Sequence, residues 1–297
     1  MIASIGVALV LLSGASAAPP KSSLVLIDAA RGKIVARIPL GGEPVRVSRG
    51  LGSFWVVLPQ ARSIIRVDPS AKKIVDRITV GKEPFDADAV RGVLWVPDHD
   101  GYDLLRVDLR THGVRRSQSF GVPALAAAYG FGKVWVALAD ARLVSIDPHS
   151  LRVVHTIRDV AYSVEGLEPS IGFDRTGVWV ADARGNELDR IDPVRQRVVF
   201  RRVCAGRGLA IAGGAAWSAD GNRKIWRVAG RKVTSLTIGS SVVDVAALGG
   251  SVWTIDATEH TAVRIDARSH RVTAKVALPD YPVSVAAGGR YVAVALG

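Results

Sequence analysis

Cysteine is nearly absent from this sequence, with Cys204 the only one in 297 residues. A single thiol excludes an internal disulfide and any zinc site built from several cysteines. Cys204 lies in the apolar segment Val203-Cys204-Ala205, with no histidine close to it in the sequence. We therefore expect a packed small residue there and not a nucleophile, because a catalytic thiol needs a neighbouring base.

The sequence also lacks the common catalytic signatures. It contains no nucleophile elbow, phosphate-binding loop, dinucleotide fingerprint or HExxH zinc motif. Acidic residues are few, with 27 Asp and Glu against 39 Lys and Arg, which gives a formal net charge of +12. Such a surplus suits an anionic partner, or it reflects only an arginine-rich source organism. Nucleic acid is not expected as that partner, because the basic segments have few aromatic residues on which bases could stack.

Long apolar runs are missing beyond the start of the chain. The segment from Ile2 to Leu12 is apolar, and Ala15-Ser16-Ala17 has the small residues of a cleavage site. These features predict a signal peptide over residues 1–17, followed by one domain over residues 18–297. The apolar run is too short for a lasting membrane helix, and no cysteine near the cleavage site could carry a lipid. We therefore expect a secreted or periplasmic protein without a transmembrane span.

Aromatic residues make up only 6% of the chain, yet they recur at a regular spacing. Consecutive members are 36 to 44 residues apart, and each follows a glycine by two or three positions. A glycine there permits the positive φ of a tight hairpin turn. The series consists of Trp55, Trp95, Trp135, Trp179, Trp217, Trp253 and Tyr291.

An aspartate series runs through the same repeats. Each member ends a short β-branched segment such as Ile65-Arg66-Val67-Asp68, and Ala229 is the one departure. We interpret these carboxylates as turn residues and not as catalytic groups, because aspartate accepts hydrogen bonds from nearby backbone N–H groups. The series consists of Asp28, Asp68, Asp108, Asp147, Asp192 and Asp266.

Each repeat contains four short strands separated by turn-forming residues. In the first complete repeat we expect strands over Pro44–Ser48, Phe54–Leu58, Ser63–Asp68 and Lys73–Val80. Four strands in about forty residues is the period of a propeller blade. Seven such repeats begin near Pro44, Pro84, Pro123, Pro169, Gly208, Val242 and Pro282.

The two ends of the chain contain complementary halves of one blade. The chain begins with a third and a fourth strand, Leu24–Asp28 and Lys33–Pro39, and ends with a first and a second, Pro282–Ala286 and Tyr291–Leu296. The sequence therefore predicts an all-β fold, a seven-bladed β-propeller of four-stranded antiparallel blades whose last blade is shared between the N- and C-termini. Such a closure removes the open sheet edge that promotes aggregation.

The repeats resemble YVTN-type β-propeller repeats from about Ser22 to Gly297. The residues that carry the resemblance are Val67-Asp68, Ile78-Thr79-Val80-Gly81-Lys82-Glu83-Pro84 and Leu94-Trp95-Val96. The chain is also similar to the streptogramin B (virginiamycin B) lyase-like propellers, whose repeats have a similar spacing. The resemblance implies the fold and leaves the function open, because propellers host many unrelated activities.

A lyase of that kind, as the resemblance implies it, uses histidines and a glutamate from late blades with a divalent cation. Its pattern has Glu two residues before His and a further His in the preceding blade. Here Glu259 and His260 are adjacent, and the preceding blade offers Asp220 and Asn222 but no histidine. A lactonase-like propeller with a central Ca²⁺ held by Glu, Asn and Asp is a second enzyme class to weigh. Whether the protein is an enzyme stays open at this point.

The loops of the predicted propeller sort onto two rims. The connection rim carries the loops between second and third strands and the connections between blades. Its acidic side chains could bind Ca²⁺ or Mg²⁺ through oxygen atoms, and its two histidines suit a softer metal or acid–base chemistry. The alternative is that Asp and Asn fill these loops for turn chemistry alone. The ligand-binding candidates are Asp98, His99, Asp100, Asp140, Asp182, Arg184, Asp220, Asn222, Glu259 and His260.

The opposite edge, the hairpin rim, carries the turns between first and second and between third and fourth strands. The latter turns are strongly basic, so we expect the positive charge on one side of the molecule. A basic rim could hold the protein near an anionic envelope surface by a salt-dependent attraction, or it could serve solubility alone. The residues are Arg31, Lys33, Lys72, Lys73, Arg110, Arg152, Arg195, Arg197, Arg231, Lys232, Arg268 and Arg271.

These observations predict an exported, monomeric binding module. It would take a small molecule, a peptide or an envelope protein on its acidic connection rim. The alternative is a metal-dependent streptogramin B lyase-like or lactonase-like enzyme acting at the same rim. The sequence requires no cofactor, and Ca²⁺ and Mg²⁺ are the candidate ions for the enzyme alternative.

Overall fold

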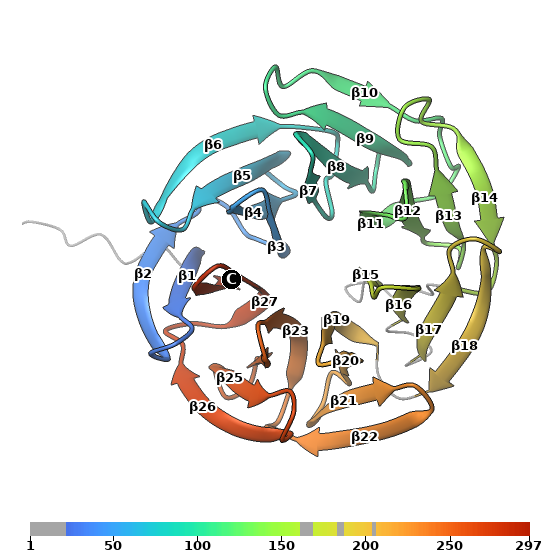
Figure 1. Ribbon diagram of the computed structural model, residues 1–297. Coiled ribbons are helices and arrows are strands. Elements are labelled where there is room, and N and C mark those ends of the chain that lie inside the picture. Colours follow the sequence, from blue (N-terminus) through green and yellow to red (C-terminus); the bar gives the residue numbers. More distant parts are fainter. Residues whose placement is uncertain (1–21, 161–168, 183–186, 204–205) are drawn as a thin grey trace, which may run out of the picture.

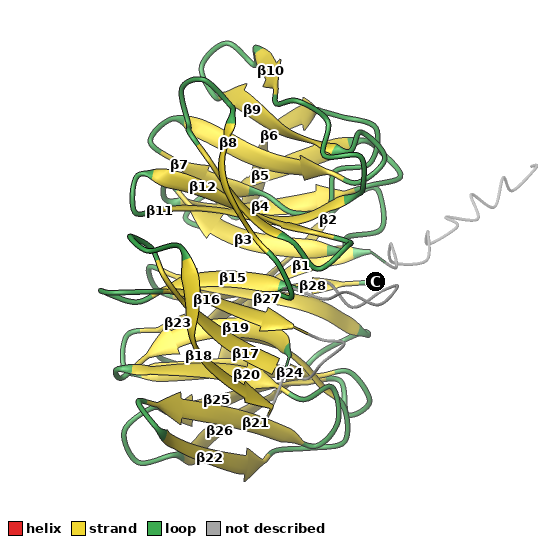
Figure 2. Cartoon of the chain, turned by 90° about the vertical axis from the view of Figure 1, so that its right-hand side faces the viewer, coloured by secondary structure: helices red, strands yellow, loops and turns green. Residues whose placement is uncertain are grey.

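Seven blades are arranged radially about a common centre in the computed structural model, which describes residues 22–160, 169–182, 187–203 and 206–297 (Figure 1). Each blade is a sheet of four antiparallel strands with its first strand innermost, and the loops gather on two opposite faces of the ring (Figure 2). Within the described ranges the chain forms no helix, and so none that could cross a membrane. The predicted seven-bladed fold is confirmed. The predicted signal peptide, Cys204 and Arg184 lie outside the described residues.

The strand bounds follow the repeat closely, and only blades 2 to 4 contain strands of three or four residues. Blade 1 comprises β3 (Arg46–Gly50), β4 (Ser53–Leu58), β5 (Ser63–Asp68) and β6 (Lys73–Thr79). Blade 2 comprises β7 (Asp88–Val90), β8 (Val93–Asp98), β9 (Asp103–Asp108) and β10 (Val114–Arg116). Blade 3 comprises β11 (Ala124–Gly130), β12 (Lys133–Leu138), β13 (Leu143–Ile146) and β14 (Val153–Ile157). Blades 4 and 5 comprise β15 (Ser170–Phe173), β16 (Val178–Asp182), β17 (Glu187–Asp192) and β18 (Arg197–Val203); and β19 (Arg207–Ala212), β20 (Ala215–Ala219), β21 (Lys224–Ala229) and β22 (Lys232–Thr237). Blades 6 and 7 comprise β23 (Val242–Leu248), β24 (Ser251–Asp256), β25 (Thr261–Asp266) and β26 (Arg271–Ala277); and β27 (Pro282–Gly288), β28 (Tyr291–Leu296), β1 (Ser23–Asp28) and β2 (Lys33–Pro39).

The seventh blade joins the two ends of the chain. Its strand order is β2-β1-β28-β27, and β1 pairs antiparallel with β28 from Ser23↔Leu296 to Asp28↔Tyr291. Both strands are buried along their whole length. The predicted closure is therefore confirmed, and the ring has no open sheet edge between its first and last blades.

The tryptophans pack each blade onto the next one around the ring. Trp55 of blade 1, for example, lies in one apolar cluster with Leu94 and Val96 of blade 2. One part of the expected aromatic series is wrong, because Tyr291 does not occupy the seventh tryptophan position. Tyr291 pairs with Gly288 at the hairpin end of its blade, and Ala293 takes the position of the tryptophan, because it pairs with Ala286 as Trp253 pairs with Ala246 in blade 6.

The aspartate series makes the turns that the sequence predicts. Asp68, for example, accepts hydrogen bonds from the backbone N–H groups of Ser70 at 2.8 Å and Ala71 at 3.1 Å. These bonds lower the pKa of its carboxyl below the usual range. The same pair of bonds recurs at Asp28, Asp108, Asp147, Asp192 and Asp266.

Arginines of the third strands form a further series that the sequence analysis did not single out. Arg66 lies over the ring of Trp55, with 5.6 Å from its guanidinium carbon to the ring centroid. A guanidinium over the face of an indole ring is attracted by the quadrupole of the ring. Some of the excess of basic residues over acidic ones therefore consists of arginines that pack on the tryptophan of their own blade. The other members are Arg106 over Trp95, Arg190 over Trp179 and Arg227 over Trp217.

Candidate functional site

The innermost strands of all seven blades line a central channel with a cavity of about 230 Å³. In each blade, one residue of the innermost strand pairs with the tryptophan of the second strand, or with Ala293 in blade 7. The residue two positions before it in the sequence is the position of interest. Polar side chains therefore collect in one layer of the channel. The seven residues at this position are Arg46, Asp86, Ala126, Ser170, Gly208, Asp244 and Ser284.

Arg46 spans the channel in this layer. From blade 1 its guanidinium donates to Ser170 Oγ at 3.3 Å and to the carbonyl oxygen of Pro169 at 3.2 Å, both in blade 4. Its Nε lies 3.6 Å from Oδ1 of Asp86 in blade 2. A single side chain thus links three blades and places a positive charge in the channel.

Asp244 of blade 6 joins blade 7, and through Ser284 blade 1, on the other side of the layer. It is buried and accepts hydrogen bonds from Ser284 Oγ at 2.8 Å and from the backbone N–H of Val285 at 2.9 Å, both in blade 7. Ser284 Oγ in turn accepts from the backbone N–H of Val47 in blade 1. Burial raises the pKa of Asp244, and the nearby charge of Arg46 opposes that rise.

Asp88 lies two residues after Asp86 in the sequence, also lines the channel cavity and is half-buried. Its Oδ2 accepts a hydrogen bond from the backbone N–H of Tyr129 in blade 3 at 2.7 Å. Burial raises the pKa of Asp88 to about 6, and the charge of Asp86 adds to the rise. This carboxyl therefore changes charge close to neutral pH.

The channel opens towards the connection rim into a pocket of about 290 Å³, which we call the mouth pocket. Its walls are the starts of β3, β19, β23 and β27 with the connections that precede them. Arg207 lies half-buried in this wall, and its guanidinium has no hydrogen-bond or ion-pair partner among the described residues. Tyr281, 47% exposed, forms the outer lip, and Asp244 with Ser284 lies at the base. The pocket thus presents an unpaired cation beside a paired one, Arg46.

Asp98, one of the predicted site residues, anchors a connection between blades. It is buried and accepts hydrogen bonds from the backbone N–H groups of Lys82 and Glu83 at 2.7 to 3.0 Å. Asp256 has the same place in blade 6, where it accepts from the backbone of Ser240 and Ser241. These contacts fit the turn-chemistry alternative, and a ligand role for Asp98 stays a prediction.

Asp140, Asp220 and Asn222 also have local partners on the connection rim. Asp140 forms a 2.6 Å ion pair with Arg142. Asp220 accepts a hydrogen bond from the backbone N–H of Asn222 at 2.8 Å, which closes a turn. Each of these three side chains is satisfied within its own loop, so the structure does not gather them around one point.

Of the remaining candidates among the described residues, only His260 contacts a residue that lines the mouth pocket. His260 packs edge-on against Tyr281, with ring centroids 6.1 Å apart. The neighbouring Glu259 forms an ion pair with Lys275 at 3.4 Å. Asp182 is buried at the end of β16. Of these, His260 comes closest to a ligand in the mouth pocket, because it supports the tyrosine at the lip.

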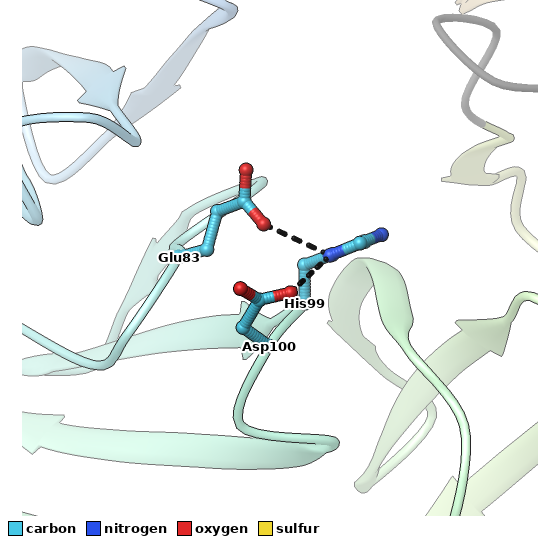
Figure 3. A group of neighbouring side chains, drawn as sticks. All are labelled: Glu83, His99 and Asp100. Atoms are coloured by element: carbon cyan, nitrogen blue, oxygen red, sulfur yellow. Dashed lines mark hydrogen bonds and ion pairs between the residues drawn. The ribbon is translucent and has the colours of Figure 1, made fainter.

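His99 and Asp100, together with Glu83, form one compact cluster on blade 2 (Figure 3). Nδ1 of His99 lies 2.9 Å from Oε2 of Glu83 and 3.0 Å from Oδ1 of Asp100. The imidazole also stacks on Phe85, with ring centroids 5.0 Å apart. Within the described ranges, no other group of three histidine, cysteine or acidic residues has ligand atoms this close together. An N–H donating to both carboxylates accounts for the geometry without an ion, and the donor types also suit a divalent metal.

The polar layer and Arg207 were missed as site residues by sequence reasoning. Neither Arg207 and Tyr281 nor Arg46 and Asp244 were among the ligand-binding candidates. The signal was present in the repeat itself. Aligning the blades on their tryptophans puts Arg46, Asp86 and Asp244 at positions where other blades have Ala, Gly or Ser.

Comparison with known proteins supports the fold alone. No protein-family model matches the chain, and no match to a curated protein was found. Among solved structures, a chain of the hydrazine synthase of Kuenenia stuttgartiensis is similar with a TM-score of 0.68 and 14% identity, over 82% of this chain and 89% of that one. The computationally designed protein Ika8 is similar with a TM-score of 0.67 and 10% identity, over 93% and 88% of the two chains. At these identities the likeness concerns the propeller architecture and not an activity.

Proposed function

We propose that this protein is a binding module that takes a small polar ligand with one anionic group in the mouth pocket. The observation that carries the proposal is the half-buried side chain of Arg207, whose guanidinium has no partner among the described residues. A guanidinium in such a place suits a carboxylate or phosphate, which it can bind through two parallel hydrogen bonds.

The pocket supplies other features that a small-ligand site needs. Its volume of about 290 Å³ is at the small end of the range for ligand sites. Ser284 and Asp244 at its base offer a fixed polar surface, because hydrogen bonds to neighbouring blades hold them in place. Tyr281 offers an aromatic face and a hydroxyl at the lip.

The setting of this module belongs to the same proposal. The predicted signal peptide places the ligand, a peptide or an envelope protein outside the cytoplasm, and the protein acts as a monomer. The twelve basic residues of the third-to-fourth turns are all exposed, which supports a salt-dependent contact with an anionic envelope surface through the hairpin rim. The resemblance to YVTN-type and streptogramin B lyase-like propellers enters here as a proposed kinship.

A second candidate function is a metal-dependent enzyme of the lyase-like or lactonase-like kind. The cluster of Glu83, His99 and Asp100 favours it, since these are the described residues whose donor atoms approach a metal-ligand arrangement. This candidate predicts that Zn²⁺, Ca²⁺ or Mg²⁺ raises the melting temperature, because a ligand bound only by the native state stabilises it. His99→Ala should abolish that rise, and EDTA should reverse it. Identical melting with each ion and with EDTA argues for the binding module.

The binding module is tested with a panel of small mono- and dicarboxylates, sugar acids and phosphates in thermal-shift assays. We expect at least one compound to raise the melting temperature of the wild type. Arg207→Gln should weaken its binding by about tenfold or more, since a charge-assisted hydrogen bond is lost. Arg223→Gln is the matched control, because Arg223 is an exposed arginine of the same blade that does not line the pocket. Equal binding by wild type and Arg207→Gln would contradict the proposal.

A further inference from the structure

The packing between blades follows one rule with one departure. Each tryptophan packs onto the next blade, against the residues just before and just after that blade's own tryptophan position. Blade 2 presents Leu94 and Val96 to Trp55. Blade 5, in contrast, presents only Ala216 and Ser218 at these positions to Trp179 of blade 4. The corresponding pairs elsewhere are Val134 and Val136, Val178 and Val180, Val252 and Thr254, and Val292 and Val294.

An interblade pocket lies where the large side chains are missing. Its volume is about 950 Å³, and it opens on the hairpin rim between blades 4 and 5. Trp179, Phe200 and Ile211 form apolar walls. The small residues from Gly213 to Ala216 leave the facing side open. The size suits an organic molecule far larger than a water or an inorganic ion.

The half-buried polar groups that line the interblade pocket are already paired. Asp174 accepts hydrogen bonds from the indole N–H of Trp179 at 2.8 Å and from Nε of Arg190 at 3.2 Å. Arg190 also covers the face of Trp179. A ligand is therefore not needed to pair a buried charge, and the floor can accept an apolar group at no electrostatic cost.

Two arginines at the opening of the interblade pocket, in contrast, have no side-chain partner among the described residues. Arg175 and Arg231 are exposed, line the pocket from blades 4 and 5, and have no hydrogen-bond, ion-pair or ring partner in the part of the chain that the structure describes. They stand on the hairpin rim, where other basic turns reinforce the positive potential. An apolar interior below a cationic opening is complementary to a molecule that has an apolar body and one anionic head.

We propose that the interblade pocket binds an amphipathic organic anion, with an acyl or aromatic body. The apolar body packs between the contacting rings of Trp179 and Phe200 on blade 4 and the small residues Gly213 to Ala216 on blade 5, and the anionic head lies between Arg175 and Arg231. This site is independent of the mouth pocket: blade 5 contributes to both, but the two pockets lie on opposite rims and share no lining residue.

Decanoate and its neutral counterpart 1-decanol are the probes, titrated by calorimetry into the full chain. We expect the wild type to bind both, with decanoate bound more tightly at low salt. Ala216→Val restores the residue type of the other interfaces, so it should weaken both probes by about tenfold or more and raise the melting temperature by about 2 to 4 °C. Wild-type protein that binds neither probe would overturn the proposal.

Two controls separate this site from general surface binding. Val252→Ala makes the same kind of opening between blades 5 and 6 and should leave decanoate affinity within about twofold, while it lowers the melting temperature. The double variant Arg175→Gln with Arg231→Gln should weaken decanoate by about five- to tenfold and leave 1-decanol unchanged. Unaltered decanoate binding in Ala216→Val would refute the assignment, as would an equal effect of the arginine variant on both probes.

Discussion

The aspartate that ends a third strand accepts hydrogen bonds from the backbone N–H groups two and three residues later, as Asp68 does from Ser70 and Ala71. Its carboxylate takes the place that a backbone carbonyl would have in a regular turn. Because the ionised form accepts these bonds, the pKa of Asp68 is lowered on folding. Six such turns therefore favour the folded state only while their carboxyls are ionised.

Acid should remove the contribution of these turns. For a carboxyl with a lowered folded-state pKa, the stabilisation is complete above the unfolded-state value of about 4 and is lost as pH falls through the folded-state value. We expect the urea midpoint, followed by tryptophan fluorescence, to fall steeply below about pH 4. Asp68→Asn should show a shallower fall than the wild type. Parallel curves for the two proteins would count against this reading of the turns.

Asp88 in the channel has the opposite pH dependence. Its pKa is raised to about 6, so the folded protein holds a proton that the unfolded chain has already released between about pH 4 and 6. The contribution of Asp88 to stability therefore declines as pH rises through this window. Asp88→Asn should remove the decline and raise the free energy of unfolding at pH 7 by about 1 to 3 kcal/mol. Urea titrations of both proteins at pH 4.5 and 7 check this, and a variant less stable than wild type at pH 7 would contradict it.

At the scale of strands and blades, the interface between blades 7 and 1 shows how the repeat compensates for a missing residue. Ala293 takes the tryptophan position of blade 7, and Phe54 of blade 1 occupies the cluster in which the two meet. The other blades have a smaller residue, such as Leu94, at the position of Phe54. A large side chain from the following blade thus fills the space that a tryptophan fills elsewhere.

Shortening Phe54 should be more costly than shortening its counterpart. We expect Phe54→Val to lower the free energy of unfolding by about 2 to 3 kcal/mol, and Leu94→Val by about 1 kcal/mol. The difference arises because Leu94 packs against Trp55, whereas Phe54 has only Ala293 opposite it. Equilibrium denaturation of the two variants measures both values. A smaller loss for Phe54→Val than for Leu94→Val would refute the compensation.

The strands could be predicted from the sequence because local signals define them. Ser63–Asp68 was predicted with its observed bounds, since a β-branched run ends at a turn-forming Asp-Pro pair. The first strand was placed at Pro44–Ser48 and is observed at Arg46–Gly50, because proline has no N–H for the ladder. Tyr291 was misplaced for a related reason. The glycine before it was matched to the wrong position of the hairpin, so the aromatic series was aligned two residues off in this blade, although the strand Tyr291–Leu296 was predicted with its observed bounds.

At the scale of the whole molecule, the ring explains why the site was less predictable than the blades. Arg46 and Ser170 are 124 residues apart in the chain and meet only because their blades face each other across the channel. Sorting loops by rim identifies which residues share a face but not which side chains reach across the centre. The acidic candidates were chosen by residue type, but Asp98 is bonded to the connection between blades 1 and 2, and Asp220 is bonded within its own loop.

The central claim is that the closed ring brings the starts of its innermost strands around one mouth, which requires β1 to pair with β28. Hydrogen exchange of the native protein, read by mass spectrometry, measures this pairing directly. The account predicts that peptides covering residues 23–28 and 291–296 exchange as slowly as those covering β4 and β5. Rapid exchange in both terminal segments, with the other blades still protected, would show an open ring and contradict the account.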